Sequence, residues 1–435
     1  LGVTGRAVAE ALKARNSEVL AVDDQPTSVA TVAEELRVEL LDSSSATELE
    51  RAFSGITAVV PSPGIPCHHL LYRLADASGV EILSELDLAA LWNDRPCAAV
   101  TGTNGKTTVT ELTTQMLLAS GMQAAAVGNT DTPFVSAIDD KEIGYEVFVV
   151  EASSFRLDRV RRFRAKAAAW LNLAPDHLDW HENFQAYARA KSKIWETQQE
   201  GDVAVAPHDD VAVGPWTKNI SSQLLTFGLG KGDVHCTDRE LIAHGERIMK
   251  ISELRRSRPH DQLNACAATA LALSMDASAK SVAEVLGNFD GLAHRLEFVA
   301  TADGVRFFDD SKATTPHATV AGMAGFDQAV LIAGGRNKGL DLLELRELAP
   351  RLAGVVVIGE SAETLTHVFD GIVTTTLANS MEEAVKAAMS IAQSSGGDVV
   401  LSPACASFDW YRNYNERGDD FQRFVRLLEQ GQIQR

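Results

Sequence analysis

Short, almost purely apolar segments alternate along the chain with longer segments in which apolar residues recur every three or four positions. The apolar segments are typical of strands buried on both faces of a sheet, and they cover residues 18–22, 56–60, 97–101, 145–150, 167–173, 305–308, 329–333, 354–358 and 398–401. The intervening segments have the period of helices with one apolar face. In the last of them, Phe421, Phe424, Val425 and Leu428 share one face. The alternation predicts an α/β fold, in which mostly parallel sheets carry flanking helices.

Two breaks in this pattern divide the chain. One lies near Ser84, before a helical segment, and the other lies at Asp290-Gly291-Leu292. The length of 435 residues corresponds to about three domains at roughly 150 residues each. We therefore expect domains at residues 1–84, 85–291 and 292–435.

The composition excludes several classes of protein. Hydrophobic residues make up 45% of the chain and charged residues 23%, which rules out collagen-like and disordered sequences. The net charge of −19 argues against sequence-independent binding to nucleic acid or to an anionic membrane. The five cysteines are scattered and form no CxxC pair, which argues against a disulfide framework or a structural zinc site. Because no apolar run is long enough to span a bilayer and no signal peptide is recognisable, we expect a cytoplasmic protein.

The strongest local motif is Thr101-Gly102-Thr103-Asn104-Gly105-Lys106-Thr107-Thr108, which follows an apolar strand and precedes a helical pattern. A glycine-rich turn before a helix directs backbone N–H groups at a phosphate. Lys106 would then reach the terminal phosphates of a nucleotide, and the Thr107 hydroxyl would bind Mg²⁺. The usual P-loop has a glycine where this chain has Val100. The alternative is an ordinary strand–turn–helix with a surface lysine.

Three positions further along could complete a nucleotide site, although each has a structural alternative. Glu151 ends an apolar strand, where such sheets place their sites, but it could equally be a carboxylate in solvent. His177 follows the next strand, and a single histidine there is more often structural than a ligand. Lys191 lies on a helical segment, where a lysine is solvated by default.

Taken in order, these motifs resemble the Mur ligase superfamily, and the resemblance spans nearly the whole chain. Three C-terminal motifs are most similar to its D-glutamate-adding branch: Asp309-Asp310-Ser311-Lys312-Ala313-Thr314-Thr315-Pro316, Ala333-Gly334-Gly335-Arg336-Asn337-Lys338-Gly339 and Leu401-Ser402-Pro403-Ala404-Cys405-Ala406-Ser407-Phe408-Asp409. The Asp-Asn-Pro-Arg motif of the diaminopimelate- or lysine-adding ligases is absent. The resemblance implies a Rossmann-like first domain for a UDP-substrate, a P-loop ATPase-like central domain and a Rossmann-like C-terminal domain for an amino acid.

The activity that the resemblance implies is an ATP-dependent ligation. D-glutamate would be added to UDP-N-acetylmuramoyl-L-alanine through an acyl phosphate, in peptidoglycan precursor synthesis and hence in cell-wall biogenesis, cell shape and division. The partners would be these small molecules, ATP and two Mg²⁺ ions, bound by a monomer. Folylpolyglutamate synthase is an alternative within the superfamily, but those enzymes begin near the ATP turn. A nicotinamide-dependent dehydrogenase and a phosphate-binding switch protein are alternatives from other classes.

The resemblance also implies roles for single residues in ATP binding and catalysis. The predicted ATP-binding residues are Gly102, Thr103, Asn104, Gly105, Lys106, Thr107, Thr108, Asn264, Arg295, Asp310 and Lys312. The predicted catalytic residues are Lys106, Glu151, His177 and Lys191. The predicted metal ligands are Thr107, Glu151, His177 and Lys191. Lys191 would carry a CO₂-derived carbamate, because a bare ammonium would repel Mg²⁺ whereas a carbamate is an anionic oxygen ligand.

Two further sets of residues are implied for the other substrates. The predicted UDP-substrate ligands are Val3, Thr4, Asp23, Asp24, Ser62, Pro63, Gly64, Asn129 and His177. The predicted D-glutamate ligands are Thr314, Lys338, Ser407 and Tyr414. Residues 1–5 resemble a strand-to-helix turn without its strand, so we expect a strand upstream. Cys405 lies close to the D-glutamate set, but no paired base is visible, and a small packed thiol is the better interpretation.

Overall fold

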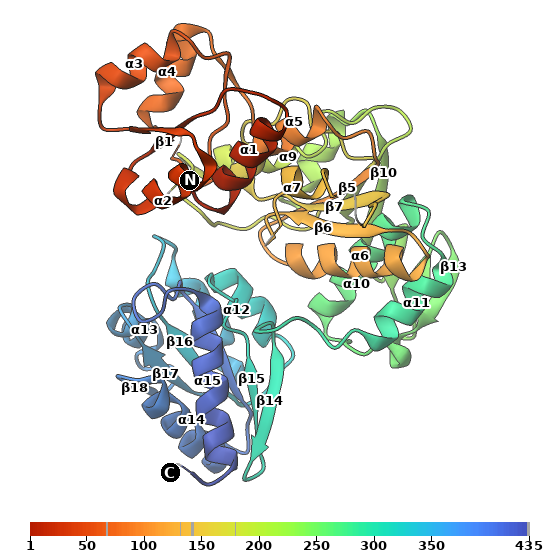
Figure 1. The fold of residues 1–435 in the computed structure, drawn as a ribbon. Helices are drawn as coiled ribbons and strands as arrows, with labels where there is room; N and C mark the ends of the chain where they lie inside the picture. Colours follow the sequence, from red (N-terminus) through yellow and green to blue (C-terminus); the bar gives the residue numbers. More distant parts are fainter. Residues whose placement is uncertain (67, 131, 141–142, 179, 433–435) are drawn as a thin grey trace. The chain divides into compact units, whose positions relative to one another are not determined.

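The computed structural model describes residues 1–66, 68–130, 132–140, 143–178 and 180–432 (Figure 1). Contacts divide the chain into two compact units. The first unit comprises residues 1–173, 180–255 and 263–288, and the second comprises residues 174–179, 256–262 and 289–435. The expected boundaries at residues 84 and 291 stay a prediction.

A nine-stranded mixed sheet forms the centre of the first unit, in the order β13-β12-β11-β10-β9-β8-β5-β7-β6. Neighbouring strands from β6 to β11 are parallel, and β12 and β13 add an antiparallel edge. The strands are β5 (Cys97–Thr101), β6 (Ala124–Gly128), β7 (Val147–Glu151), β8 (Ala167–Trp170), β9 (Val203–Pro207), β10 (Gln223–Leu229), β11 (Val234–Cys236), β12 (Glu240–Ala243) and β13 (Glu246–Lys250). Every residue of β5, β7 and β8 is buried, as their apolar sequences predict.

Helices flank this sheet on the central part of the chain. They are α5 (Glu85–Ala90), α6 (Lys106–Ala119), α7 (Phe134–Ala137), α8 (Ser154–Leu157), α9 (Phe184–Ser192), α10 (Pro259–Ser274) and α11 (Ala279–Asn288), with the 3₁₀ helices η1 (Gly214–Asn219) and η2 (Ile251–Glu253). The predicted apolar face of α6 is buried, including Val109, Leu112, Met116 and Leu117. Its C-terminal end is tied to α11, because the Ser281 hydroxyl donates to the Ala119 carbonyl.

The N-terminal part of the first unit has little sheet. Two short parallel pairs, β1–β2 and β3–β4, replace the continuous Rossmann-like sheet that the resemblance implies. The elements are α1 (Val3–Ala14), β1 (Leu20–Asp23), α2 (Pro26–Leu36), β2 (Glu39–Asp42), α3 (Ala46–Phe53), β3 (Ala58–Val59), α4 (Leu70–Ser78) and β4 (Glu81–Ile82). A small core that includes Phe53, Val59, Leu71 and Tyr72 holds part of this region together.

The second unit is built on a six-stranded sheet in the order β14-β15-β19-β16-β17-β18. All neighbours are parallel except β14 and β15. Its elements are β14 (Glu297–Ala302), β15 (Val305–Asp309), α12 (Pro316–Met323), β16 (Ala329–Gly334), η3 (Leu342–Arg351), β17 (Leu352–Ile358), α13 (Ala362–Phe369), β18 (Thr375–Leu377), α14 (Met381–Ser395), β19 (Val399–Ala404) and α15 (Tyr414–Glu429). Two apolar clusters contain residues of this sheet, one with α12 and α13 and the other with α14 and α15.

The predicted fold class is confirmed: both units are α/β, with large, mostly parallel sheets and flanking helices (Figure 1). The predicted face of the last helix is also confirmed, since Phe421, Val425 and Leu428 are buried on α15. Among the described residues, no helix is long and apolar enough to cross a membrane. Cys97, Cys236, Cys266 and Cys405 are free and buried.

Candidate active site

The glycine-rich turn lies between β5 and α6, and a single amide side chain holds its shape. The Asn172 Oδ1 atom accepts hydrogen bonds from the backbone N–H groups of Thr103 and Asn104, at 3.0 and 2.9 Å. The Asn172 Nδ2 atom donates a hydrogen bond of 3.1 Å to the Asn104 carbonyl. Asn172 follows β8, the neighbour of β5 in the sheet. The residue that fixes the turn, Asn172, therefore lies at the end of the adjacent strand.

Gly105 is the N-cap of α6 and has a φ of +84°, a conformation that L side chains rarely adopt. A Cβ atom at this position would lie 2.5 Å from the Asn264 Oδ1 atom. Asn264, one of the predicted ATP-binding residues, therefore packs directly against the phosphate turn. Because Gly105 has no side chain to cap α6, the helix N-terminus is left as a site for an anion.

Two lysine side chains meet at the turn. The Lys106 Nζ atom lies 2.9 Å from the Gly102 carbonyl oxygen, and the Lys191 Nζ atom lies 2.7 Å from the same oxygen. Lys191 is 1% exposed, and its ammonium lies 4.6 Å above the Tyr187 ring. The Tyr187 hydroxyl is in turn 3.1 Å from the Thr103 hydroxyl. Residues from α9 and from the turn thus form one buried cluster.

Glu151 ends β7 opposite Val100 of β5, so its carboxylate leaves the sheet at the same edge as the turn. Its Oε1 atom accepts a hydrogen bond of 2.9 Å from Asn129 Nδ2, and its backbone carbonyl accepts one of 2.8 Å from Asn129 N. The Oε2 atom is buried and has no hydrogen-bond partner among the described residues. A buried carboxylate oxygen without a donor is destabilising unless a cation meets it.

The buried Glu151 Oε2 atom is the observation that decides whether these residues fit a magnesium ion. Mg²⁺ prefers oxygen ligands such as carboxylates, hydroxyls and phosphates, and Glu151 and Thr107 provide the first two kinds. Asn129 holds the carboxylate in place through its other oxygen. The residues of the first unit therefore fit a metal ion bound next to a nucleotide phosphate.

Gly128 explains how Asn129 reaches this position. Its φ is +96°, and a Cβ atom would lie 2.5 Å from the Glu151 carbonyl oxygen. Only glycine allows the end of β6 to approach β7 so closely.

The second unit contains the predicted ligand His177 and brings it near another predicted residue. The His177 Nε2 atom lies 3.3 Å from Asp176 Oδ2, and the Lys338 Nζ atom lies 3.1 Å from Asp176 Oδ1. His177 has a φ of +53°, a strained backbone that often marks a functional position. Asp176 thus links the predicted metal ligand to the predicted D-glutamate ligand.

Asp310, one of the predicted ATP-binding residues, is buried. It is 7% exposed, and its carboxylate accepts hydrogen bonds from the Ser402 hydroxyl at 2.8 Å and from Leu296 N at 3.3 Å. Burial raises the pKa of Asp310 to about 7, and the Ser402 hydrogen bond and the charge of Arg295 offset this only in part. The role of Asp310 in ATP binding stays a prediction.

A buried arginine links two of the predicted segments of the second unit. Arg417 is 1% exposed and donates to the carbonyls of Ser311 and Cys405, at 2.8 and 3.1 Å. It therefore ties the Asp310-Ser311-Lys312 segment to the Cys405–Ser407 segment. Lys312 places its ammonium 3.7 Å from the centre of the Tyr414 ring. Thr314 is half-buried and Ser407 is buried.

Cys405 is a packed thiol, as the sequence predicts. It is 1% exposed, and burial raises its pKa to about 11. A thiol with a raised pKa is a poor nucleophile at neutral pH.

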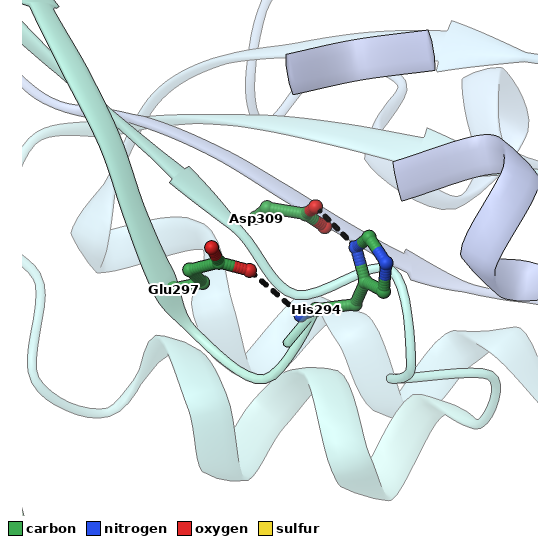
Figure 2. Close-up of side chains that lie close together, drawn as sticks. All are labelled: His294, Glu297 and Asp309. Carbon is green, nitrogen blue, oxygen red and sulfur yellow. Dashed lines mark hydrogen bonds and ion pairs between the residues drawn. The ribbon is translucent and has the colours of Figure 1, made fainter. Parts of the chain in front are cut away.

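His294, Glu297 and Asp309 form a close cluster in the second unit, and Figure 2 shows their side chains converging. His294 Nδ1 lies 2.7 Å from Asp309 Oδ2, and Glu297 Oε2 accepts a bond of 3.0 Å from His294 N. Gln422 Nε2 donates to both carboxylates, at 3.0 and 2.9 Å. Because N–H donors already occupy these oxygens, we interpret the cluster as a hydrogen-bond network that positions the neighbouring Arg295 and Asp310.

Apart from Asn129 and His177, the predicted UDP-substrate residues lie in the N-terminal part of the first unit. Thr4 is in the first turn of α1, and a Cβ atom on Gly5 would lie 3.2 Å from the Ser62 hydroxyl. Ser62 therefore lies against the start of α1. Asp24 is 3.1 Å from His69 Nε2, and Asp23 ends β1. Val3 and Gly64 are exposed, and Pro63 is half-buried.

The predicted residues divide between the units. The first unit contains the phosphate turn, Glu151, Lys191 and Asn264. It also contains every predicted UDP-substrate residue except His177. The second contains His177, Arg295, Asp310, Lys312 and the D-glutamate set.

The sequence analysis missed Asn172, Tyr187, Asp176 and Arg417. A signal existed for Asn172, because it is a polar residue just after a buried strand, as Glu151 is. No sequence signal distinguishes the buried Arg417 from the exposed arginines of the same helix.

Two family models and several curated relatives match this chain. The Mur ligase middle domain matches residues 100–272, and the Mur ligase, glutamate ligase domain matches residues 294–405. A UDP-N-acetylmuramoylalanine--D-glutamate ligase of Desulfosudis oleivorans is 39% identical over 445 residues, which cover 99% of this chain and 96% of the relative. The ligase of the same name from Frankia casuarinae is 38% identical, with 99% of this chain and 93% of the relative covered.

Two solved structures share the fold. The MurF ligase of Thermotoga maritima in complex with ADP superimposes with a TM-score of 0.64 at 18% identity, and the match covers 96% of each chain. The UDP-N-acetylmuramate-alanine ligase MurC of Thermotoga maritima gives a TM-score of 0.60 at 19% identity, with 99% and 97% covered.

Proposed function

The chain belongs to the Mur ligase family, and from this membership we infer that it is an ATP-dependent ligase that joins a carboxylate to an amine. The reaction is the addition of D-glutamate to UDP-N-acetylmuramoyl-L-alanine, in peptidoglycan precursor synthesis. Relatives with this name are 34–39% identical to the chain. In the structure, the observation that carries the proposal is the orphaned Glu151 Oε2 atom at the sheet edge where the phosphate turn lies.

ATP is a substrate of this reaction. Its phosphates would lie against the turn at residues 102–105 and the N-terminus of α6, where the backbone conformation is held by Asn172. Lys106 would donate to the terminal phosphates, and Asn264, next to Gly105, would contact the adenine. Arg295, Asp310 and Lys312 are the proposed nucleotide ligands of the second unit.

Mg²⁺ would be held by Thr107 and Glu151, with His177 and Lys191 as the further ligands we propose. When bound, the ion lowers the repulsion between an anionic nucleophile and the anionic phosphate. The contribution of the chain is to hold the carboxylate of Glu151 rigid through Asn129 and to provide cations at the turn.

The reaction has two steps, the formation of an acyl phosphate and the formation of the amide. An oxygen of the L-alanine carboxylate attacks the γ-phosphorus of ATP, the bond from this phosphorus to the bridging oxygen breaks, and ADP leaves with the electron pair. The unprotonated amine of D-glutamate then attacks the acyl carbon of the acyl phosphate. The tetrahedral intermediate expels inorganic phosphate, and the nitrogen loses a proton. Donors fixed in place before the reaction, such as Lys106, stabilise the developing charge.

Lys191 is proposed to act as its carbamate. The amine nitrogen of a carbamate keeps one N–H, so the hydrogen bond to the Gly102 carbonyl can remain. The change also replaces the second of two ammonium groups at this carbonyl by an anion.

The other substrates have proposed sites on both units. The UDP-substrate would be held by Thr4 at the start of α1 and by Ser62, which lies against it. D-glutamate would be held by Thr314, Lys338, Ser407 and Tyr414. We propose that the enzyme acts in the cytoplasm as a monomer.

Release of inorganic phosphate tests this function. Purified protein supplied with ATP, Mg²⁺ and UDP-N-acetylmuramoyl-L-alanine should release phosphate only when D-glutamate is added. Glu151→Gln should lower the rate by about 100-fold or more, because the variant loses a charge at the reacting phosphate. Equal release with and without D-glutamate would show that the protein is not this ligase. A requirement for folate and glutamate instead would identify a folylpolyglutamate synthase.

A further inference from the structure

Asp409 connects the turn that follows β19 to the loop that follows β17. Its Oδ2 atom accepts a hydrogen bond of 3.0 Å from Glu360 N, just before α13. Gly359 has a φ of +68°, and a Cβ atom at this position would overlap the same oxygen, so the close approach requires a glycine. The partial positive charge at the N-terminus of α13 favours a carboxylate at this place.

Asp409 shares a closed turn with Ser407, one of the predicted D-glutamate ligands. The Ser407 carbonyl oxygen accepts hydrogen bonds from Trp410 N at 3.2 Å and from Tyr411 N at 2.9 Å. Ser407 itself is 2% exposed. Because the turn is short and two backbone hydrogen bonds close it, a carboxylate that is fixed at Asp409 also fixes the backbone of Ser407.

The loop that follows β16, which carries Lys338, pairs with the same turn. Arg336 N donates to the Ala406 carbonyl at 2.8 Å, and Ala406 N donates to the Arg336 carbonyl at 3.0 Å. Ser361, the N-cap of α13, donates to the Gly335 carbonyl from its hydroxyl at 2.6 Å and from its backbone N–H at 3.0 Å. The loops after β16, β17 and β19 are therefore connected to one another in a ring.

An arginine balances the charge of Asp409. The Arg336 Nε and Nη2 atoms lie 3.0 and 2.7 Å from the two carboxylate oxygens of Glu360. The hydrogen bond to Glu360 is the main cause that raises the pKa of Arg336, and the charge of Asp409 adds to it. Because Asp409 is an anion, it would repel the carboxylates of a substrate, and any effect on such a substrate must pass through the loops that it connects.

We propose that Asp409 is a positioning residue for the binding of D-glutamate. Its carboxylate holds the Ser407 turn at the N-terminal end of α13, and the connected loops then keep Ser407 and Lys338 at the separation that the substrate requires. This inference rests on the proposed function for the identity of the substrate. D-glutamate has two carboxylates, and ligands on separate loops bind both tightly only when the loops are already fixed, because ordering them on binding costs free energy.

Steady-state kinetics of the ligase test the proposal through the separate effects on KM and kcat. Asp409→Ala should raise the KM for D-glutamate by about 10-fold, while kcat at saturating D-glutamate stays within about twofold, because the lost interaction serves binding alone. The KM for ATP should not change. Asp409→Asn keeps an acceptor oxygen for Glu360 N and should recover most of the affinity. An unchanged KM for D-glutamate in Asp409→Ala, or a loss confined to kcat, would overturn the proposal.

Gly359→Ala tests the same contact from the other side and has a matched control. The new Cβ atom would displace the Asp409 carboxylate, so the KM for D-glutamate should rise as it does in Asp409→Ala. Gly371→Ala imposes the same backbone strain, because Gly371 also has a φ of +68°, but nothing lies within 4 Å of its Cβ position. The control should therefore lose stability while the KM for D-glutamate stays normal. An equal rise of this KM in Gly371→Ala would show that the contact with Asp409 does not matter.

A role confined to stability gives a different result, which a second control defines. Ser380→Ala removes a comparable hydrogen bond, from Glu383 N at the start of α14, and should lower the free energy of unfolding in urea without changing the KM for D-glutamate. The same behaviour in Asp409→Ala would contradict the proposal. If Asp409→Ala does not fold, Gly359→Ala decides, since a normal KM for D-glutamate in that variant refutes the positioning role.

The parent protein separates this inference from the proposed function. Absence of D-glutamate-dependent phosphate release in the parent refutes the proposed function and the inference with it. Release that depends on D-glutamate, with the parent KM in both Asp409→Ala and Gly359→Ala, refutes this inference alone.

Discussion

Lys191 is a buried lysine whose ammonium lies close to a second ammonium. It is 1% exposed, although lysine is normally solvated. Its ammonium shares the Gly102 carbonyl with the ammonium of Lys106. Like charges repel strongly in a buried site, so conversion of one amine to a carbamate would exchange repulsion for attraction.

Bicarbonate labelled with ¹³C tests this at the level of the residue. The parent protein should show a carbamate carbonyl resonance that disappears in Lys191→Ala, because that variant has no amine to modify. The same variant should lose ligase activity, and added bicarbonate should not restore it. Lys193→Ala, two residues further on, is the control and should keep the resonance. Full activity of Lys191→Ala would contradict the carbamate.

Asp310 predicts a dependence of stability on pH. Its pKa rises from 3.8 to about 7 on folding, mainly because the carboxyl is buried. Between these values the folded state binds more protons than the unfolded state, so the contribution of Asp310 to stability decreases as pH rises through this window. Asp310→Asn cannot ionise and escapes this loss. Its free energy of unfolding relative to the parent should therefore increase between pH 4 and 7, by at most about 1.4 kcal/mol per pH unit.

Urea denaturation of both proteins across this pH range measures that difference. The comparison with the parent at each pH removes the contribution of His294, whose pKa is raised mainly by its hydrogen bond to Asp309. A constant difference between the two proteins from acid to neutral pH would show that Asp310 titrates normally.

At the scale of elements, the proposed nucleotide site of the first unit is formed where three neighbouring strands of the central sheet end. β5, β7 and β8 are adjacent parallel strands. The phosphate turn, Glu151 and Asn172 follow or end them, so their side chains meet at one edge of the sheet. Gly105 and Gly128 then permit close approaches that a side chain would block.

Gly105→Ala should weaken ATP binding by about 10-fold or more, because the new Cβ atom would clash with Asn264 in addition to straining the backbone. Gly121→Ala separates these effects. Gly121 has a similar φ of +89° but nothing within 4 Å of its Cβ position, so this variant should lose stability by about 1 kcal/mol while ATP binds normally. Fluorescent-nucleotide titration measures both affinities. Equal affinity of the two variants would show that the contact with Asn264 does not matter.

The sequence predicted best those strands that are buried on both faces. β5 was predicted at its observed bounds, and β7, β8, β16, β17 and β19 within a few residues, because continuous apolar runs have few other solutions in an α/β fold. The strands β10 to β13 were missed. β11, β12 and β13 have only three to five residues and mix charged or polar residues with apolar ones, so they resemble loops in a single sequence.

The candidate site was predicted in part for a similar reason. A glycine-rich turn and strand-end polar residues are local features, so Lys106, Glu151 and their neighbours could be identified along the chain. The contacts of Asp176 with Lys338, and of Asp409 with Glu360, join distant segments. Only the folded structure can bring such pairs together.

For the whole molecule, the net charge of −19 is compatible with anionic substrates. Anions are not drawn to the surface as a whole. In the proposed function they would be bound locally, by the N-termini of α1 and α6, by Mg²⁺ at the Glu151 carboxylate, and by single cations such as Lys106 and Lys338. This arrangement provides selectivity, because each cation is held by an identified neighbour.

Transfer of labelled oxygen tests the central claim, which is that the protein activates a carboxylate as an acyl phosphate. UDP-N-acetylmuramoyl-L-alanine with ¹⁸O in its carboxylate would be incubated with ATP, Mg²⁺ and D-glutamate, and the released phosphate analysed by mass spectrometry. The account predicts one ¹⁸O atom in each phosphate, since the carboxylate oxygen that attacks the γ-phosphorus departs with it. Unlabelled phosphate, formed by attack of water on ATP, would contradict the account.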